Sequence, residues 1–441
     1  MSSNEAVPKL SLTQGKKNKR DYGAHQSNIY RGMSRPCSCS MRPYRQLRRP
    51  TDGTFLNKFP LVTTDPNKLA AQAKEKLPET SYNYIAGGAG EKATMDANRL
   101  AFRQWKLVPR MLRETSIRDL TIELFGEKYE TPILMAPIGV QSIFHEDKET
   151  GLAEVCAELD VPFIMSTAAS STIEEVAEAS GNGPRWYQLY WPQDDEVTLS
   201  LLDRAKKNGF KVLVVTLDTW ALAWRPADLD NGYVPFIKGT GVQVGLSDPV
   251  FRRKCRAKFG HEPEENIVEA SVAWLGDVVS GKSHTWDRLK LLRDNWEGPL
   301  VLKGIQKHPE DAKLAIEHGC DGIIVSNHGG RQLDGAVASL EMLPEIVDAV
   351  GDKATVLFDS GIRTAADIIK ALSLGAKAVL VGRPVIYGLG IAGKAGAKEV
   401  LQGILADLDQ SMGLAGIQRV GDCKREMLRK VVYGGDVKSS Y

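Results

Sequence analysis

The sequence of 441 residues lacks several features that mark common classes of protein. It contains no run of about 18 consecutive apolar residues, which excludes a conventional membrane-spanning helix. No apolar segment follows Met1, so we expect no secretory signal peptide. The six cysteines are too few and too scattered for a disulfide framework or a zinc cluster. Hydrophobic residues make up 42% and charged residues 25%, which is the balance of a globular protein.

The net charge of +2 conceals an uneven distribution of basic and acidic residues. Residues 1–60 contain 12 Lys or Arg and three Asp or Glu, against 45 and 52 in the remainder, so a segment of +9 precedes a body of −7. This composition predicts a basic, disordered N-terminal extension, with the folded domain in residues 61–441. The extension could contact RNA, a membrane surface or an import receptor, but it has no interleaved aromatic residues and no repeated basic helical face. We therefore expect neither a nucleic-acid nor a membrane partner.

Eight short apolar runs alternate with amphipathic stretches from Thr131 onward, the pattern of repeated βα units. The runs are apolar at consecutive positions, as expected for strands buried on both faces. Helical periodicity separates them, for example in Asp311–His318 and Thr364–Leu374. Eight such units favour an α/β fold of the (β/α)8 TIM-barrel type over a doubly wound sheet, because no Gly-rich phosphate loop follows the first run. The predicted strands are Pro132–Gly139, Val161–Ser166, Arg185–Trp191, Val212–Asp218, Leu300–Lys303, Gly322–Asn327, Thr355–Asp359 and Ala378–Arg383.

Two further segments complete the predicted architecture. More than sixty residues separate Asp218 from Thr285, where most connections are far shorter. An insertion of this kind is a lid, a binding loop or a disordered segment, and we expect a lid over the barrel at about residues 220–285. Before the barrel, residues 69–130 predict a helical prelude that ends in two short strands near Leu120–Thr131.

Polar residues follow seven of the eight predicted strands, at the barrel face where active sites lie. The most informative segment is Ser326–Arg331, in which His328 and Arg331 flank two glycines. An imidazole can accept a proton near neutral pH, and a guanidinium can hold a carboxylate by two parallel hydrogen bonds. In isolation, His328 could equally cap the strand and Arg331 could be a surface charge. The polar residues at the ends of the other strands favour a functional site instead. Those candidates are Ser166, Gln188, Tyr190, Thr216, Asp218, Lys303, Asp359 and Arg383.

The last two strands lead into loops that each pair a glycine with an arginine, in Asp359–Arg363 and Val381–Pro384. Because backbone N–H groups at helix N-termini bind phosphate, and barrels often hold phosphate after strands seven and eight, these loops indicate a phosphorylated ligand or cofactor. The segment Gly388–Gly393 matches dinucleotide-binding spacing, but no second strand is evident after it. We interpret its glycines as sites of close helix packing.

Together these motifs resemble the FMN-dependent α-hydroxy acid oxidase and dehydrogenase family over roughly Pro66 to Gly416. Ser326–Gln332 is close to the signature of that family. The segments Thr216–Trp220, Trp224–Pro226 and Asp248–Phe251 resemble the lactate 2-monooxygenases in particular, as do Leu302–Gln306 and Asp21–Tyr30. The resemblance implies FMN as cofactor and oxidation of a small, lactate-like L-2-hydroxy acid with O2, giving acetate, CO2 and water. It leaves open an oxidase that releases keto acid and H2O2, or a dehydrogenase that acts on a bulkier hydroxy acid.

The resemblance also implies roles for individual residues. His328 would be the catalytic base and Asp218 its carboxylate partner, with Lys303 on the N1 side of the flavin, where a cation stabilises reduced flavin. Arg225 and Arg331 would clamp the substrate carboxylate. Tyr84 and Tyr190 would hydrogen-bond substrate oxygens, and Tyr190 would also be a catalytic residue. The flavin ring would contact Ala136, Pro137, Ile138, Ser166, Gln188 and Thr216, and the ribityl phosphate would contact Asp359, Gly361, Arg363, Gly382 and Arg383.

Some positions depart from the family pattern. Ala168 stands where glycolate oxidase carries a bulky tryptophan, so we expect a different preference among hydroxy acids. No haem-binding motif precedes the barrel, so we do not expect the haem-fused dehydrogenase architecture. Ser439–Tyr441 is not a peroxisomal address. The basic N-terminus mildly resembles a mitochondrial presequence, but Glu5 and the lack of a clear amphipathic helix favour a cytoplasmic protein. Residues 33–57 match nothing in the family, and we interpret them as a disordered insertion of the kind that a retained intron would create. Family members commonly form tetramers or larger rings, and we expect a homo-oligomer here.

Two other classes of function compete with this interpretation. A glycoside hydrolase barrel would need two carboxylates at strand ends, and Asp218 with Asp359 is the available pair. That reaction would leave the His-Gly-Gly-Arg segment and the two Gly-Arg loops without a role. A non-catalytic binding protein that uses its basic extension is the second alternative, and it requires no cofactor.

Overall fold

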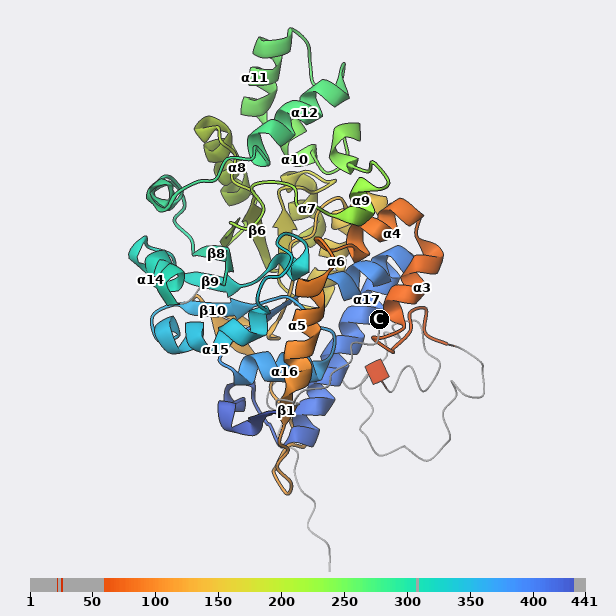
Figure 1. Cartoon of the computed structure of the whole chain (residues 1–441), viewed down its shortest axis with the longest axis vertical. Helices are drawn as coiled ribbons and strands as arrows, with labels where there is room; N and C mark the ends of the chain where they lie inside the picture. The colour runs from red at the N-terminus through yellow and green to blue at the C-terminus, as the bar shows by residue number, and fades with distance from the viewer. Residues whose placement is uncertain (1–21, 23–24, 27–58, 307–308, 432–441) are drawn as a thin grey trace, which may run out of the picture.

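The computed structural model describes Tyr22, His25, Gln26, residues 59–306 and residues 309–431, and Figure 1 shows their arrangement. The predicted N-terminal extension lies outside the described residues apart from Tyr22, His25, Gln26, Phe59 and Pro60. The unmatched stretch 33–57 lies wholly outside them.

Eight parallel strands close into a barrel in which each strand pairs with its neighbours in chain order and the last pairs with the first. All eight predicted strands are confirmed, and the fold is a (β/α)8 barrel. Several boundaries were wrong. The first strand ends at Met135 rather than Gly139, and β8 continues to Ile305, so Lys303 lies within that strand rather than at its end. The strands are β4 (Ile133–Met135), β5 (Phe163–Ser166), β6 (Arg185–Leu189), β7 (Leu213–Thr216), β8 (Leu300–Ile305), β9 (Gly322–Val325), β10 (Thr355–Phe358) and β11 (Val379–Val381).

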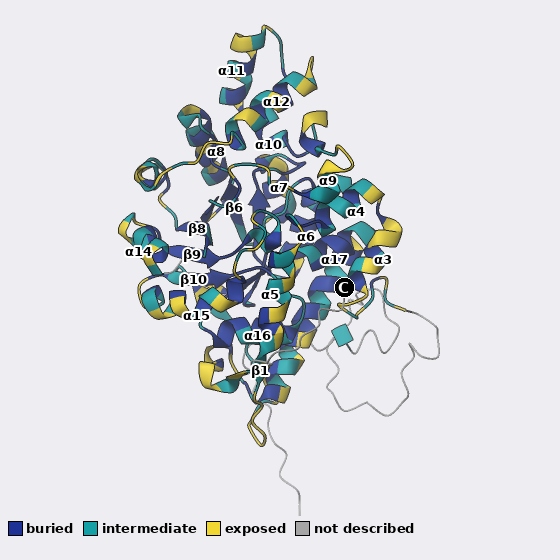
Figure 2. Ribbon diagram, in the orientation of Figure 1, coloured by how far each residue is buried: buried dark blue, intermediate teal, exposed yellow. Residues whose placement is uncertain are grey.

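Side chains alternate between the inside of the barrel and the helices outside it, and Figure 2 shows the strands as the most deeply buried part of the chain. The interior is filled by one apolar cluster that includes Leu134, Ile164, Trp186, Val214, Val301, Ile324, Leu357 and Leu380. Two positions later on each strand, and therefore on the same face, the residues are mostly polar. These are Ala136, Ser166, Gln188, Thr216, Lys303, Ser326, Asp359 and Gly382.

The prelude and a hairpin cover the two ends of the barrel. Helices α3 (Leu69–Lys76), α4 (Glu79–Ala86) and α5 (Ala93–Gln104) precede it, followed by the predicted pair of short strands, β2 (Ile122–Leu124) and β3 (Glu127–Tyr129). This hairpin closes the amino end of the barrel, where Trp186 Nε1 donates to the Tyr129 hydroxyl at 3.2 Å. Helices α6 (Lys148–Glu158), α7 (Ile173–Ser180), α8 (Asp195–Lys207), α13 (Leu289–Asn295), α14 (Pro309–Glu317), α15 (Ser339–Val350), α16 (Ala365–Ser373) and α17 (Arg383–Ala415) follow the barrel strands.

The glycine-rich segment Gly388–Gly393 lies inside α17, and its predicted packing role is confirmed. A Cβ atom on Gly388 would stand 2.6 Å from the carbonyl oxygen of Gly396. The expectation that no strand follows this segment was wrong, because β12 (Leu428–Lys430) pairs antiparallel with β1 (Trp105–Leu107). Among the described residues no helix, α17 included, has both the length and the apolar character needed to cross a membrane.

The predicted insertion at about residues 220–285 is largely helical. It contains α9 (Pro226–Leu229), α10 (Gln243–Leu246), α11 (Pro249–Phe259) and α12 (Ile267–Val278). Figure 1 shows α10, α11 and α12 together at the top of the molecule, beyond one end of the barrel. Asp248 begins α11 by accepting hydrogen bonds from the backbone N–H groups of Val250 and Phe251, each at 3.0 Å.

Candidate active site

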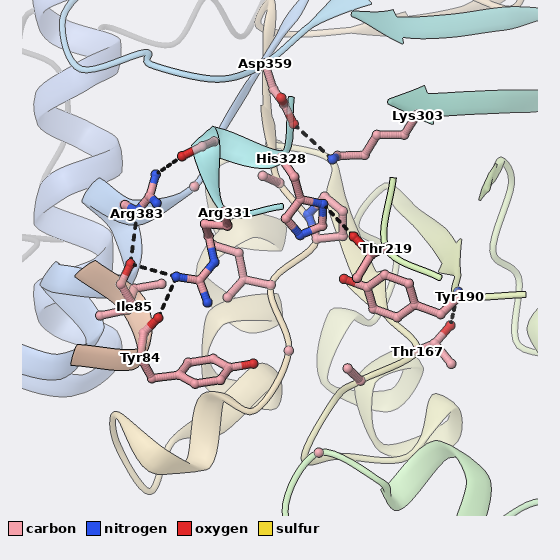
Figure 3. Close-up of a pocket in the computed structure, with 18 of the residues that line it drawn as sticks. Tyr84, Ile85, Thr167, Tyr190, Thr219, Lys303, His328, Arg331, Asp359 and Arg383 are labelled. Atoms are coloured by element: carbon pink, nitrogen blue, oxygen red, sulfur yellow. Dashed lines mark hydrogen bonds and ion pairs between the residues drawn. The ribbon is translucent and has the colours of Figure 1, made fainter. Parts of the chain in front are cut away.

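A cavity of about 1220 Å³, which includes space open to solvent, lies between the carboxyl ends of the barrel strands, α4 and the insertion. Four predicted site residues do not line it but lie at the strand ends: Ser166, Gln188 and Thr216, which are buried, and Asp218, which is half-buried. The other predicted site residues all line it, and Figure 3 shows several of them around one space. They are Tyr84, Ala136, Pro137, Ile138, Tyr190, Arg225, Lys303, His328, Arg331, Asp359, Gly361, Arg363, Gly382 and Arg383.

His328 is held by a carboxylate and a hydroxyl on one side of its ring. Its Nδ1 lies 2.8 Å from Asp218 Oδ1 and 3.1 Å from Thr219 Oγ1. Burial favours the neutral form of Asp218, but Lys303 and His328 outweigh it and hold the carboxyl pKa below its usual range. Burial lowers the pKa of His328, against the opposing effect of Asp218. The imidazole is therefore neutral at pH 7 with its proton on Nδ1 toward the carboxylate, which leaves Nε2 as the basic nitrogen.

The backbone that carries His328 is left-handed over three residues, with φ of 55° at His328, 65° at Gly329 and 72° at Gly330. The histidine backbone N–H donates to Ser326 Oγ at 3.1 Å. A side chain at Gly330 would be strained by its φ and would also place Cβ 2.6 Å from Met95 Cγ. The two glycines of the motif are thus required by backbone geometry and by the close approach of α5.

Sequence reasoning missed two residues that position this loop. Ser360, itself at φ 84°, accepts from the backbone N–H of Gly329 at 3.0 Å and donates to Asp359 Oδ1 at 2.7 Å. Asn98 and Asn327 exchange two side-chain amide hydrogen bonds, both 2.8 Å long and buried. The position of Ser360 inside the Asp-Ser-Gly motif was a usable signal; nothing near Asn98 in the sequence indicated its partner.

Lys303 places a buried ammonium between two carboxylates. Its Nζ donates to Ser326 Oγ at 3.1 Å and lies 3.5 Å from Asp359 Oδ2 and 3.9 Å from Asp218 Oδ2. Figure 3 shows the Lys303 side chain reaching toward Asp359. Burial disfavours the ammonium, but Asp359 and Asp218 more than compensate and raise the lysine pKa. Lys303 therefore carries a permanent positive charge at the cavity wall.

Arg225 and Arg331 lie next to each other, and hydrogen bonds to backbone oxygens and to the Gln332 side chain hold both guanidinium groups. Arg331 Nη1 donates to the backbone oxygens of Tyr84 at 2.5 Å and Gly87 at 2.9 Å. Arg225 Nε donates to the backbone oxygen of Arg331 at 3.0 Å, and its Nη2 to Gln332 Oε1 at 2.5 Å. Burial and the neighbouring Arg225 lower the pKa of Arg331 to about 10, so Arg331 stays charged at pH 7. Two adjacent guanidinium groups, that of Arg225 buried and that of Arg331 half-buried, attract an anion such as a carboxylate.

The two tyrosines approach from different elements, Tyr84 from α4 and Tyr190 from the end of β6. The backbone N–H of Tyr190 donates to Thr167 Oγ1 at 3.1 Å. Burial, and then Asp218, raise the pKa of Tyr190, so its hydroxyl remains protonated and able to donate a hydrogen bond. The ring of Tyr84 meets Tyr233 of the insertion edge to face, with centroids 6.3 Å apart.

Gln188 Nε2 and Thr216 Oγ1 are buried next to the cavity and have no hydrogen-bond partner among the described residues. The oxygen of the Gln188 amide already has a partner, since Oε1 accepts a hydrogen bond from Ser166 Oγ at 2.9 Å. Buried polar groups normally find partners. A heteroaromatic ring with oxygen and nitrogen atoms on its rim, placed over the strand ends beside Ala136 and Pro137, would satisfy both atoms. The residues present therefore fit a flavin ring.

The opposite part of the cavity is strongly basic. Arg383 begins α17 and donates to the backbone oxygens of Gly329 at 2.9 Å and Ile85 at 3.0 Å. Burial, with Arg331 and other neighbours, lowers its pKa to about 9. Arg363 lies in the same cavity, and burial lowers its pKa as well. Two cationic side chains beside a helix N-terminus fit a phosphate group. The described residues contain no cluster of three or more His, Cys, Asp or Glu suited to a metal ion.

Comparisons with known proteins agree with this geometry. The FMN-dependent dehydrogenase family matches residues 73–430. The chain is 60% identical over 388 residues to the FMN-dependent alpha-hydroxy acid dehydrogenase qulF of Penicillium citrinum, covering 88% of this chain and 96% of that protein. It is 40% identical to an L-lactate oxidase of Lysinibacillus sphaericus (strain C3-41), covering 83% and 94%. A crystal structure of mandelate oxidase superposes with a TM-score of 0.73 at 34% identity, covering 84% of this chain and 99% of that one.

Proposed function

This chain belongs to the FMN-dependent dehydrogenase family, and from that membership we propose a specific reaction. Its cofactor is FMN, and the enzyme oxidises an α-hydroxy acid. The proposal is that the substrate is a small, lactate-like L-2-hydroxy acid and that O2 is the acceptor, as in the lactate 2-monooxygenase reaction, which yields acetate, CO2 and water. The observation that carries it is His328, which is paired with Asp218 and lines one cavity together with Arg225 and Arg331.

In this proposal the substrate carboxylate lies between Arg225 and Arg331, and Tyr190 donates a hydrogen bond to a substrate oxygen. His328 Nε2 faces the substrate and accepts a proton as the acid is oxidised. Asp218 holds the imidazole in the required tautomer and stabilises the imidazolium that forms. FMN, when bound, supplies the two-electron sink that no side chain provides.

The cofactor is proposed to contact three groups of residues. Gln188 and Thr216 would hydrogen-bond the ring, with Ala136, Pro137 and Ile138 along its edge and Ser166 supporting the Gln188 amide. Lys303 would place its charge beside the ring. The ribityl phosphate would be held by Asp359, Gly361, Arg363, Gly382 and Arg383.

A second candidate is the oxidation of a bulkier hydroxy acid, with release of the keto acid. The insertion faces the cavity mainly with apolar side chains, among them Phe236, Trp274 and Val278. Ala168 leaves space on the opposite strand loop. Relatives of this chain named for lactate and for 4-hydroxymandelate oxidation show that the family takes side chains of both sizes.

The two candidates are separated by the flavin spectrum during anaerobic addition of L-lactate, L-2-hydroxyisocaproate and (S)-mandelate. Bleaching by lactate, followed in air by acetate without free peroxide, supports the monooxygenase. Pyruvate with peroxide supports an oxidase, and bleaching by the larger acids alone supports the second candidate. A flavin that none of these acids reduces would contradict both.

We further propose that the enzyme forms a homotetramer or larger homo-oligomer, as the resemblance implies, and that it acts in the cytoplasm. Light scattering of the purified holoenzyme measures its mass in solution, and a monomer would contradict the proposal.

A further inference from the structure

A second cavity lies where the insertion rejoins the barrel, and of the residues assigned above to FMN or substrate only Thr216 lines it. It encloses about 1050 Å³, including space open to solvent, between the end of β7, the end of α12 and residues 282–289. Three tryptophans and a histidine line it, and we call it the tryptophan pocket: Trp191, Trp220, Trp286 and His284.

One wall of the tryptophan pocket is an ordered aromatic stack. The rings of Trp191 and His284 lie nearly parallel, at 15°, with centroids 4.2 Å apart. Trp191 is almost fully buried, and its Nε1 has no hydrogen-bond partner among the described residues. Trp220, by contrast, is 47% exposed, so its ring is accessible to a ligand. Flat aromatic walls of this kind favour a planar ring, which can stack on them.

The charged and polar side chains of the tryptophan pocket favour an anionic ligand. Lys282 is the one charged side chain among the described residues that line it, and no carboxylate does so. Ser283 and Thr285 add hydroxyl donors beside the lysine. Burial lowers the pKa of His284, so this imidazole is neutral at pH 7. An ammonium with hydroxyl donors and no competing acid suits a carboxylate.

We propose that the tryptophan pocket binds a planar aromatic carboxylate and that the bound ligand slows turnover at the active site. The first part stands on the pocket alone, whereas the second rests on the proposed function. Thr219 and Val278 line both cavities. Thr219 contacts His328 Nδ1 at 3.1 Å, and Val278 is the last residue of α12. The backbone N–H of Gly281 donates to the Trp220 oxygen at 3.1 Å, so the two ends of the insertion already meet at this pocket.

A ligand seated here would contact both ends of the insertion at once. Turnover in an enzyme with a covering segment often depends on opening of that segment. We therefore expect the aromatic acid to lower kcat at saturating hydroxy acid, and to do so without displacing a ligand of the arginine clamp.

The test uses the complete FMN-loaded enzyme and 1-naphthoate as probe, with binding followed by calorimetry. We expect binding to persist when oxalate saturates the arginine clamp. Lys282→Met and Trp220→Ala should each weaken naphthoate binding about tenfold or more, which corresponds to a loss of about 1.4 kcal/mol of binding free energy. Turnover in the absence of naphthoate should be unchanged in both variants. Lys290→Met is the matched control, since Lys290 is exposed on α13 beside Asp294 and outside the pocket.

The unaltered enzyme supplies a second measurement that needs no variant. The neutral analogue 1-naphthamide should bind more weakly than 1-naphthoate, because it offers Lys282 no charge. Displacement of naphthoate by oxalate, equal affinities of Lys282→Met and Lys290→Met, or equal binding of acid and amide would each overturn the site. Failure of every hydroxy acid to reduce the flavin would instead contradict the proposed function and leave the binding result intact.

Discussion

Individual buried charges decide the protonation of the candidate base. Opposing effects act on the pKa of His328: burial and Lys303 lower it, whereas Asp218 raises it. Burial has the largest effect and lowers the pKa of His328, so this histidine stays neutral to a lower pH than a free histidine, whose pKa is 6.5. Asp218 remains ionised throughout this range because Lys303 and His328 hold its pKa low. A neutral imidazole beside a fixed carboxylate is the state that a general base requires.

The protonation state of His328 predicts the pH profile of kcat/KM. A base must be unprotonated, so activity should rise as the pH passes upward through the pKa of His328 and then level off, with an inflection below pH 6.5. In Asp218→Asn the carboxylate that orients Nδ1–H is gone, and kcat should fall by roughly 10² or more. Rapid-mixing measurement of flavin reduction across the pH range checks both results.

The flavin spectrum of Asp218→Asn serves as the control, since Asp218 does not line the cavity and cofactor binding should persist. An acid-side inflection well above pH 6.5, or an Asp218→Asn enzyme of normal rate, would contradict the assignment of His328 as the base.

Among the secondary-structure elements, the loops after β4 and β5 depend on one buried acid at the start of α6. Glu149 is fully buried, and its Oε1 accepts from the backbone N–H groups of Gln141 at 2.9 Å and Ser170 at 3.0 Å. Its Oε2 lies 3.3 Å from Ser171 Oγ. The two loops that it joins carry Pro137, Ile138 and Ala168 on the cavity wall. A single side chain thus fixes the relative position of two adjacent active-site loops.

We predict that Glu149→Ala lowers the free energy of unfolding by at least about 2 kcal/mol, because two buried backbone N–H groups lose their acceptor. Glu149→Gln keeps an oxygen for both groups and should lose clearly less. FMN affinity should fall in the same order, as the flavin-edge loops loosen. Denaturant unfolding and flavin titration measure the two effects.

Glu154→Gln on the same helix is the matched control, since Glu154 pairs with Lys394 at the surface, and such pairs contribute about 0–1 kcal/mol. Equal losses from Glu149→Ala and Glu154→Gln would show that Glu149 has no special role in joining the loops.

For the molecule as a whole, the barrel with its covering helices is complete within residues 59–431. All eight strands of the closed barrel lie within the described residues 59–306 and 309–431. Of residues 1–58, the described Tyr22 donates from its hydroxyl to the backbone oxygen of Glu130 at 3.2 Å, and His25 lines a cavity beside α17. Such contacts stabilise the body modestly compared with its core.

We predict that deletion of residues 1–58 leaves FMN binding and hydroxy acid turnover in place, with Tm lower by only a few degrees. The deletion removes a net charge of +9, so any binding to polyanions should weaken strongly. Flavin absorbance, turnover and thermal unfolding of the truncated and full chains make the comparison. A truncated protein that folds without flavin would show that the N-terminal segment belongs to the site.

Local patterns in the sequence determined most of the barrel and much of the candidate site. The eight strands were predicted because burial on both faces makes each one a continuous apolar run. The His328–Arg331 motif and the two Gly-Arg loops were recognisable because their residues are neighbours in the chain, as side chains on one short loop must be.

Only the tertiary structure decided what depends on contacts between distant segments. The pairing of β1 with β12, the amide exchange between Asn98 and Asn327, and the support of two loops by Glu149 each join residues without a shared local pattern. The same holds for the anchoring of Arg331 by the backbone of α4 and for the tryptophan pocket at the base of the insertion. Periodicity records which face of an element is buried, but which other element covers that face is determined only when the whole chain has folded.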